Sequence, residues 1–83
     1  MEKSIYSARY GAFLKLLKKA RRDAGLTQTQ LARRIGETQT LVSKCERGER
    51  RIDVIELHTF CRAFGMSLKQ FVAALDRAIS RTK

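Results

Sequence analysis

The stretch from Thr27 to Gly48, TQTQLARRIGETQTLVSKCERG, constrains the fold most, because it predicts two short helices joined by a tight turn. Thr27 and Gln30 have the spacing of a capping box, in which backbone amides at the start of a helix gain side-chain partners. The apolar residues that follow recur at helical spacing, and they are Leu31, Ala32 and Ile35. A first short helix is therefore expected to begin just after Thr27.

The turn that follows carries its own signals. Gly36 comes after the last apolar residue, where the backbone needs a left-handed conformation that glycine adopts without steric cost. Thr38 is placed to cap a second helix. Val42 and Cys45 form the apolar stripe of that helix, and Gly48 ends it. Because the connection is so short, the two helices should cross steeply and pack against each other at once.

The second helix is expected to present a polar side to solvent. Its members form hydrogen bonds or carry positive charge, and they are Gln39, Thr40, Ser43, Lys44 and Arg47. A helix of this size fits the major groove of DNA, where base edges offer donors, acceptors and methyl groups. The pattern therefore favours nucleic-acid recognition.

Three segments together resemble the helix-turn-helix of the Cro and phage-repressor type, the Xre family: GLTQTQLARRIG, TQTLVSKCERGER and ELHTFCRAFGMSL. The resemblance covers about residues 12 to 75. It implies an all-α, compact five-helix, lambda-repressor-like DNA-binding domain, with the helix-turn-helix at its second and third helices. Two positions depart from the family pattern. Glu37 stands in the turn where many members carry an apolar residue, and Cys45 replaces a larger aliphatic residue.

The resemblance also implies roles for single residues. An arginine four residues before the glycine that ends the first helix pairs with a glutamate near the end of the third helix, and here these are Arg21 and Glu46. A planar guanidinium suits such a partly buried pair. Gln28 stands where related proteins contact a DNA phosphate, since free amides at a helix N-terminus favour anions.

Base reading is expected from Gln39, Thr40 and Lys44, with Ser43 behind them. Gln39 can make a paired hydrogen bond to adenine, Thr40 can contact thymine, and Lys44 suits the acceptors of guanine. The further phosphate candidates share a position beside the third helix, and they are Thr38, Arg47, Arg50 and Arg51. The charged loop 49–51 has an alternative interpretation as a solvated turn. Likewise, the lysines of the first helix are either solvated or in contact with phosphate.

The other helices follow from caps and apolar spacing. The first should run from a Ser7 cap to about Ala24, with a core side made of Phe13, Leu17, Ala20 and Ala24. The fourth should begin at the Asp53–Glu56 capping box, with a buried side made of Val54, Leu57, Cys61 and Phe64 and with Phe60 flanking it. The fifth should begin at Ser67 and Gln70, with an apolar set made of Leu68, Phe71, Val72, Leu75 and Ile79. We expect one domain over residues 1–83: an arm at 1–6, five helices within 7–79 and a frayed tail at 80–83.

One such domain reads few base pairs, and two-fold dimers overcome this by spacing two recognition helices one DNA turn apart. A homodimer on a palindromic operator is therefore expected. Its interface residues lie on the fourth and fifth helices, and they are Ile55, His58, Phe71, Leu75 and Ile79. The predicted function is a sequence-specific transcriptional regulator acting as a repressor or controller on double-stranded DNA. The alternative is an antitoxin or adaptor-type protein-interaction module of the same fold.

Charge supports a polyanionic partner, because 18 basic and 8 acidic residues give a formal net charge of +10. Residues 1–51 hold 13 basic and 5 acidic side chains, a net +8, so the helix-turn-helix lies in the basic part of the chain. An enzyme is the poorest fit: the sequence has one histidine, no nucleophile–base spacing and no phosphate-binding glycine loop.

Several other classes are not favoured. No apolar run is long enough to cross a bilayer, and the N-terminus lacks the pattern of a secretory signal. Cys45 and Cys61 each fall in a helical apolar pattern outside any metal-ligand cluster. We expect them to be buried free thiols in a reducing cytoplasm. No cofactor, metal, membrane or small-molecule ligand is expected.

Overall fold

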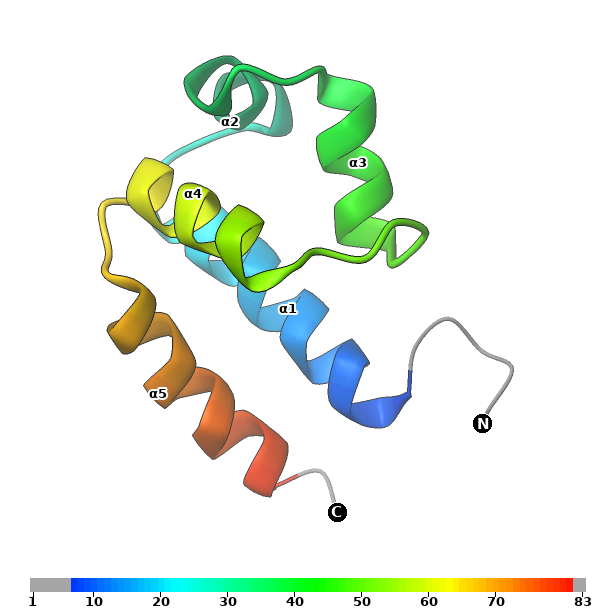
Figure 1. The fold of residues 1–83 in the computed structure, drawn as a ribbon, viewed down its shortest axis with the longest axis vertical. Coiled ribbons are helices and arrows are strands. Elements are labelled where there is room, and N and C mark those ends of the chain that lie inside the picture. Colours follow the sequence, from blue (N-terminus) through cyan, green and yellow to red (C-terminus); the bar gives the residue numbers. More distant parts are fainter. Residues whose placement is uncertain (1–6, 82–83) are drawn as a thin grey trace.

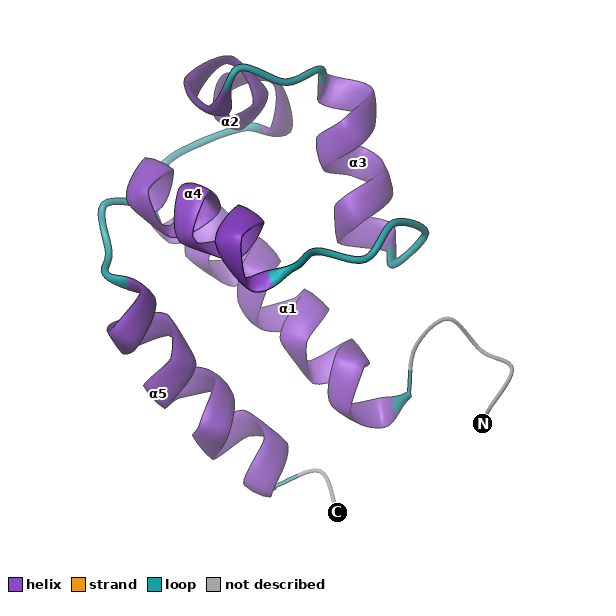
Figure 2. Cartoon of the chain, viewed as in Figure 1, coloured by secondary structure: helices purple, strands orange, loops and turns teal. Residues whose placement is uncertain are grey.

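A computed structural model of the chain describes residues 7–81, which fold into five helices joined by short loops (Figure 1). The helices are α1 (Ala8–Asp23), α2 (Gln28–Ile35), α3 (Gln39–Arg47), α4 (Val54–Phe64) and α5 (Leu68–Ser80). Within 7–81 the chain is helix and loop without a strand (Figure 2). The predicted all-α, five-helix fold is confirmed. The predicted arm, 1–6, and the end of the predicted tail lie outside the described residues.

The helix starts follow the predicted caps. Three of them are full capping boxes, and the pairs are Thr27 with Gln30, Asp53 with Glu56, and Ser67 with Gln70. At the starts of α1 and α3, the side chains of Ser7 and Thr38 each accept a backbone N–H. The turn glycine Gly36 has a φ of 72°, in the left-handed region that it was expected to occupy. Local side-chain chemistry therefore fixes where each helix begins.

The helices pack around a single cluster of buried side chains. Helix α2 packs against α3 and α4, while α1 packs against α3 and α5. Figure 1 shows α5 running alongside α1, with α3 projecting at the other end of the molecule. The centre of the core is fully buried and consists of Leu17, Leu31, Val42, Cys61 and Phe71. This core holds α2 and α3 against the scaffold that the other three helices form.

The prediction of which side of α4 is buried is wrong at two residues. Val54 is 59% exposed, because it lines an open groove between α1, α4 and α5 that no described residue fills. Phe60, expected only to flank the stripe, is 3% exposed and belongs to the core. It packs edge-to-face against Phe64, which is half-buried.

The place of Phe71 in the predicted dimer interface is also wrong. Phe71 has no exposed surface, and its ring packs edge-to-face against Phe13 of α1 with a centroid distance of 5.9 Å. The apolar side of α5 is wide, and this part of it faces α1. Phe71 therefore holds α5 on the domain instead of offering surface to a partner.

Candidate nucleic-acid interface

Helix α3 is mounted on the domain by one side. Val42, Cys45 and Glu46 are each at most 3% exposed, and they face the core and α1. Cys45 is well covered although it is smaller than the residue usual at its place in the family. The opposite side of α3 carries the polar residues, and this side stays accessible.

The predicted base-reading residues lie on that accessible side. Gln39, Thr40 and Lys44 are exposed, and Ser43 is half-buried. Ser43 accepts a hydrogen bond from Arg47, one helical turn further along. Donors, acceptors and positive charge are thus brought together along one side of a short helix, which is the chemistry that base edges require.

A buried ion pair anchors the inner side of α3. Arg21 Nε lies 2.7 Å from Glu46 Oε2, and Arg21 Nη2 lies 3.1 Å from Glu46 Oε1. The two side chains are only 10% and 2% exposed. Arg21 Nη1 also donates to the carbonyl oxygen of Leu26, at 2.9 Å. The expected Arg21–Glu46 pair is present, and it ties α1 to the end of α3 and to the loop before α2.

Two glutamines extend this pair to the surface. Gln28 Nε2 donates to Glu46 Oε1 at 2.9 Å, and Gln39 Nε2 donates to Gln28 Oε1 at 2.7 Å. Gln28 and Gln39 are the first residues of α2 and α3. The sequence predicted Gln28 as a phosphate contact and did not indicate its hydrogen bonds to Glu46 and Gln39. The signal that could have found them is that a tight turn brings the starts of two helices together.

The predicted phosphate residues are spread around α3, and several have partners within the protein. Arg47 Nε donates to Glu49 Oε2 at 2.9 Å, and this hydrogen bond lowers the pKa of the Glu49 carboxyl. Arg50 Nη2 donates to Glu56 Oε2 at 2.7 Å and lowers the pKa of that carboxyl too. Thr38 is exposed at the start of α3, where its hydroxyl accepts the backbone N–H of Leu41.

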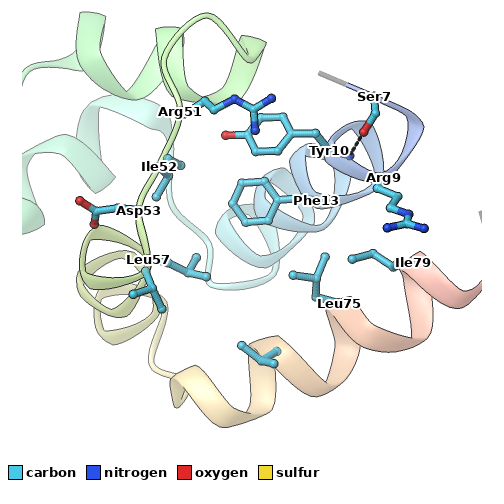
Figure 3. A pocket seen from close by; sticks show the side chains of 12 residues that line it. Ser7, Arg9, Tyr10, Phe13, Arg51, Ile52, Asp53, Leu57, Leu75 and Ile79 are labelled. Atoms are coloured by element: carbon cyan, nitrogen blue, oxygen red, sulfur yellow. Dashed lines mark hydrogen bonds between the residues drawn. The ribbon is translucent and has the colours of Figure 1, made fainter. Parts of the chain in front are cut away.

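Arg51 takes another direction. Its guanidinium carbon lies 4.4 Å from the centroid of the Tyr10 ring, in a cation–π contact at the edge of the groove described above (Figure 3). Arg51 is nevertheless exposed. The structure thus brings Gln28, Gln39 and Glu46 together, whereas Arg51 is directed toward α1.

A second accessible surface is apolar. The groove between α1, α4 and α5 is lined by Leu75, Ile79, Val54 and Val72, among others (Figure 3). Ile55 and His58 are exposed on α4, and Ile55 is the most exposed large apolar residue in the described part of the chain, at 72%. Four of the five residues predicted for a dimer interface therefore have surface that a partner could contact.

The remaining titratable groups form no metal cluster in the described part of the chain, where no three of His, Cys, Asp and Glu come together. Cys45 and Cys61 are buried free thiols, as predicted. Burial raises the pKa of both, and that of Cys61 to about 11. None of the helices within 7–81 combines the length and apolar character that a bilayer span requires.

Comparisons with known proteins agree with this geometry. Residues 17–71 match the family described as helix-turn-helix. An uncharacterised HTH-type transcriptional regulator of Sinorhizobium fredii, y4dJ, is 39% identical over 56 residues, which are 68% of this chain and 73% of that protein.

Two solved structures are also similar. One is an XRE-family like protein from Pseudomonas syringae pv. tomato, 48% identical, with a TM-score of 0.79 over 84% of this chain and 85% of the other. The clp gene regulator ClgR from Corynebacterium glutamicum is 23% identical, with a TM-score of 0.76 over 93% of this chain and 81% of the other. The latter shares the fold alone.

Proposed function

Because the chain belongs to the Xre-type helix-turn-helix family of transcriptional regulators, we propose that it binds a palindromic operator in double-stranded DNA as a homodimer and represses transcription in the cytoplasm. One observation carries this proposal. The inner side of α3 is buried, including Glu46 near its end. Gln39, Thr40 and Lys44 on its outer side are exposed. A helix held in this way can enter a major groove without unfolding the domain.

Base recognition is assigned to the start and middle of α3. Gln39 offers an amide donor and acceptor for adenine, Thr40 a methyl or hydroxyl group, and Lys44 a donor for guanine. Ser43 accepts a hydrogen bond from Arg47, so we assign it the lesser role of orienting the Arg47 guanidinium.

Phosphate contacts are assigned to Gln28, Thr38, Arg47, Arg50 and Arg51. Gln28 and Thr38 stand at the N-termini of α2 and α3, where free backbone amides favour an anion. Arg47 and Arg50 would exchange a carboxylate for a phosphate, which reduces the net gain from each contact. Arg51 lies over the Tyr10 ring of α1, so a phosphate that it contacts would lie beside α1.

The test of DNA reading begins with selection of bound sites from a random pool. Gln39→Ala is then compared with the wild type on the selected duplex and on random duplex. Loss of a good bidentate contact should relax discrimination at one base pair by about 1–3 kcal/mol. Binding to random DNA should change little. Lys69→Ala, an exposed change on α5, is the matched control. Equal losses of Gln39→Ala on both duplexes would remove Gln39 from the base-reading set.

Dimerisation is assigned to α4 and α5. Ile55 and the groove beside Leu75 and Ile79 leave apolar surface in water that a second copy would cover. Ile55→Lys should shift the protein to a monomer in light scattering at micromolar concentration and weaken binding to the full palindrome. Thr29→Lys, exposed on α2, is the control for the light-scattering measurement. A wild-type monomer with and without DNA would contradict the assignment.

The apolar groove also favours a second candidate, an antitoxin or adaptor that binds another protein through it. A salt titration on random duplex separates the two. Phosphate contacts release counterions, so the DNA-binding function predicts a steep loss of affinity with rising salt. The slope of log affinity against log salt concentration should fall by about one for each phosphate-contacting side chain that is removed. A flat dependence would favour the adaptor.

A further inference from the structure

We propose that the buried carboxylate of Glu46 sets the direction in which the Gln39 amide faces, and thereby which base α3 prefers. Gln28 transmits this effect between them. Glu46 is thus a positioning residue for recognition, in addition to being a partner of Arg21. This proposal rests on the DNA-binding function proposed above. Glu46 is 3% exposed and Gln39 is exposed, so the buried end of this series of hydrogen bonds acts on its accessible end.

The first step follows from hydrogen-bonding chemistry. A carboxylate accepts hydrogen bonds and donates none, whereas an amide has a donor and an acceptor end. Glu46 is held in place because both of its oxygens accept from Arg21. Gln28 can therefore satisfy Glu46 Oε1 only through its NH₂ group, at 2.9 Å. The carbonyl oxygen of Gln28 is consequently turned toward the start of α3.

The second step repeats this logic at the surface. Gln28 Oε1 needs a donor, and Gln39 Nε2 supplies one at 2.7 Å. Gln39 then keeps its second N–H and its carbonyl oxygen for a base. A neighbouring donor and acceptor match the N7 and N6 groups of adenine in the major groove. The direction of the chain fixes the order in which Gln39 presents them.

Without the acceptor at Glu46, this order is not defined. The terminal torsion of a glutamine is broad and nearly two-fold, so the Gln28 amide can turn over and offer its NH₂ group to Gln39. Gln39 then turns its oxygen inward and presents its donor and acceptor in reverse. Adenine loses its advantage at that base pair, while contacts elsewhere along α3 persist.

The test measures base discrimination with the whole chain. Gln28→Met removes both hydrogen bonds of Gln28 and leaves the Arg21–Glu46 pair in place. Discrimination at the base pair that Gln39 reads should fall by about tenfold, and discrimination at the other positions should stay unchanged. Thr29→Met, the exposed neighbour on α2, is the control. A uniform loss on every duplex would show that Gln28 contacts only phosphate, and would overturn the proposal.

A swap of the two groups sharpens this test. Glu46→Gln gives position 46 a donor, so this single variant should lose the discrimination, whereas Gln28→Glu alone keeps an acceptor facing Gln39 beside a second carboxylate. The double variant Gln28→Glu with Glu46→Gln restores an acceptor facing Gln39 and should recover it. A double variant that discriminates no better than Glu46→Gln alone overturns the proposal. Thermal melts identify variants that do not fold, in which case Gln28→Met decides.

A measurement without DNA separates this proposal from the proposed function. In the free protein, the Gln39 side-chain amide should give NMR signals of a fixed orientation, with slowed rotation that Gln28→Met releases. An unchanged Gln39 amide would overturn the positioning role even where specific DNA binding stands. Equal wild-type binding to all duplexes would instead overturn the DNA-reading function, and with it the consequence for base choice.

Discussion

Two arginine–glutamate pairs near the end of α3 have nearly the same geometry and different surroundings. Arg21 and Glu46 approach to 2.7 Å, as do Arg50 and Glu56, and each guanidinium contacts both oxygens of its carboxylate. The first pair is 10% and 2% exposed, and the second is 40% and 35% exposed. Contact distance therefore does not distinguish the two pairs, whereas access to water does.

The difference determines what each pair does for the molecule. When one partner of a buried pair is removed, the remaining charge lies away from water without compensation, which typically costs about 3–5 kcal/mol. An exposed charge that loses its partner is hydrated at little cost. The Arg21–Glu46 pair is thus a condition for holding α3 on α1, while the Arg50–Glu56 pair adjusts the loop that leads into α4.

The largest expected effect is that of Arg21→Met. It leaves Glu46 buried and unpaired, so unfolding should become easier by about 3–5 kcal/mol. For a domain this small, that loss is a large part of the total stability. Thermal unfolding followed by circular dichroism measures it, with Arg22→Met, an exposed neighbour, as the control. Equal melting temperatures of the two variants would end the contrast between the pairs.

The next largest effect is a recovery of stability. Arg21→Met combined with Glu46→Met removes both charges and fills the space with apolar atoms. The double variant should be more stable than Arg21→Met alone by about 2 kcal/mol, even though Gln28 loses its acceptor. The same melts test this. A double variant less stable than the single would mean that the glutamate contributes mainly through its packing and through Gln28.

The exposed pair should show a smaller effect that depends on pH. The hydrogen bond from Arg50 holds the pKa of the Glu56 carboxyl below its ordinary value. The stability that this carboxyl contributes is therefore present above the ordinary glutamate pKa and is lost as pH falls through the lowered pKa. Glu56→Gln keeps an acceptor for the capping box, so only the charge is removed.

We accordingly expect Glu56→Gln to lower the melting temperature by a few degrees at most at about pH 7. As pH falls through the lowered pKa and the wild-type Glu56 carboxyl becomes protonated, the difference should shrink. Melts across this range measure it. A difference that is equally large at low pH would place the effect in the cap instead of the ion pair.

The smallest effect is expected at a fully hydrated pair. Lys19 Nζ lies 2.7 Å from Asp23 Oδ2, and the two side chains are 70% and 63% exposed. Asp23→Asn should change the free energy of unfolding by no more than about 0.5 kcal/mol, and high salt should remove even that. A larger loss would show that a short contact is valuable even in water.

The parts of the fold that depend on neighbouring residues were predictable from the sequence. Helix starts are predicted by Thr27 with Gln30 and by Asp53 with Glu56, because both partners of each capping box lie within one turn. Gly36 predicts a helix end, because glycine itself adopts the left-handed backbone conformation needed there. The Arg21–Glu46 pair required the family resemblance, since 25 positions separate the two residues.

The parts that depend on which surface is covered were not predictable in this way. Helical spacing showed that Phe71 and Leu75 share a side of α5, but not that α1 covers the first and leaves the second beside a groove. The partners of Arg50 and Arg51 and the path from Gln39 to Glu46 likewise arise only when separate elements meet. Periodicity identifies the apolar side of a helix, whereas packing decides how much of it water reaches.

The turns of this protein are made with glycine and capping side chains, and the chain contains no proline. Slow refolding phases of small proteins commonly arise from prolyl bonds that have isomerised in the unfolded chain. This chain has no such bond to wait for, and most of its residue pairs in contact are close in sequence, although α1 also packs against α5. A denatured population should therefore regain its structure in one rapid exponential step, without the help of a prolyl isomerase.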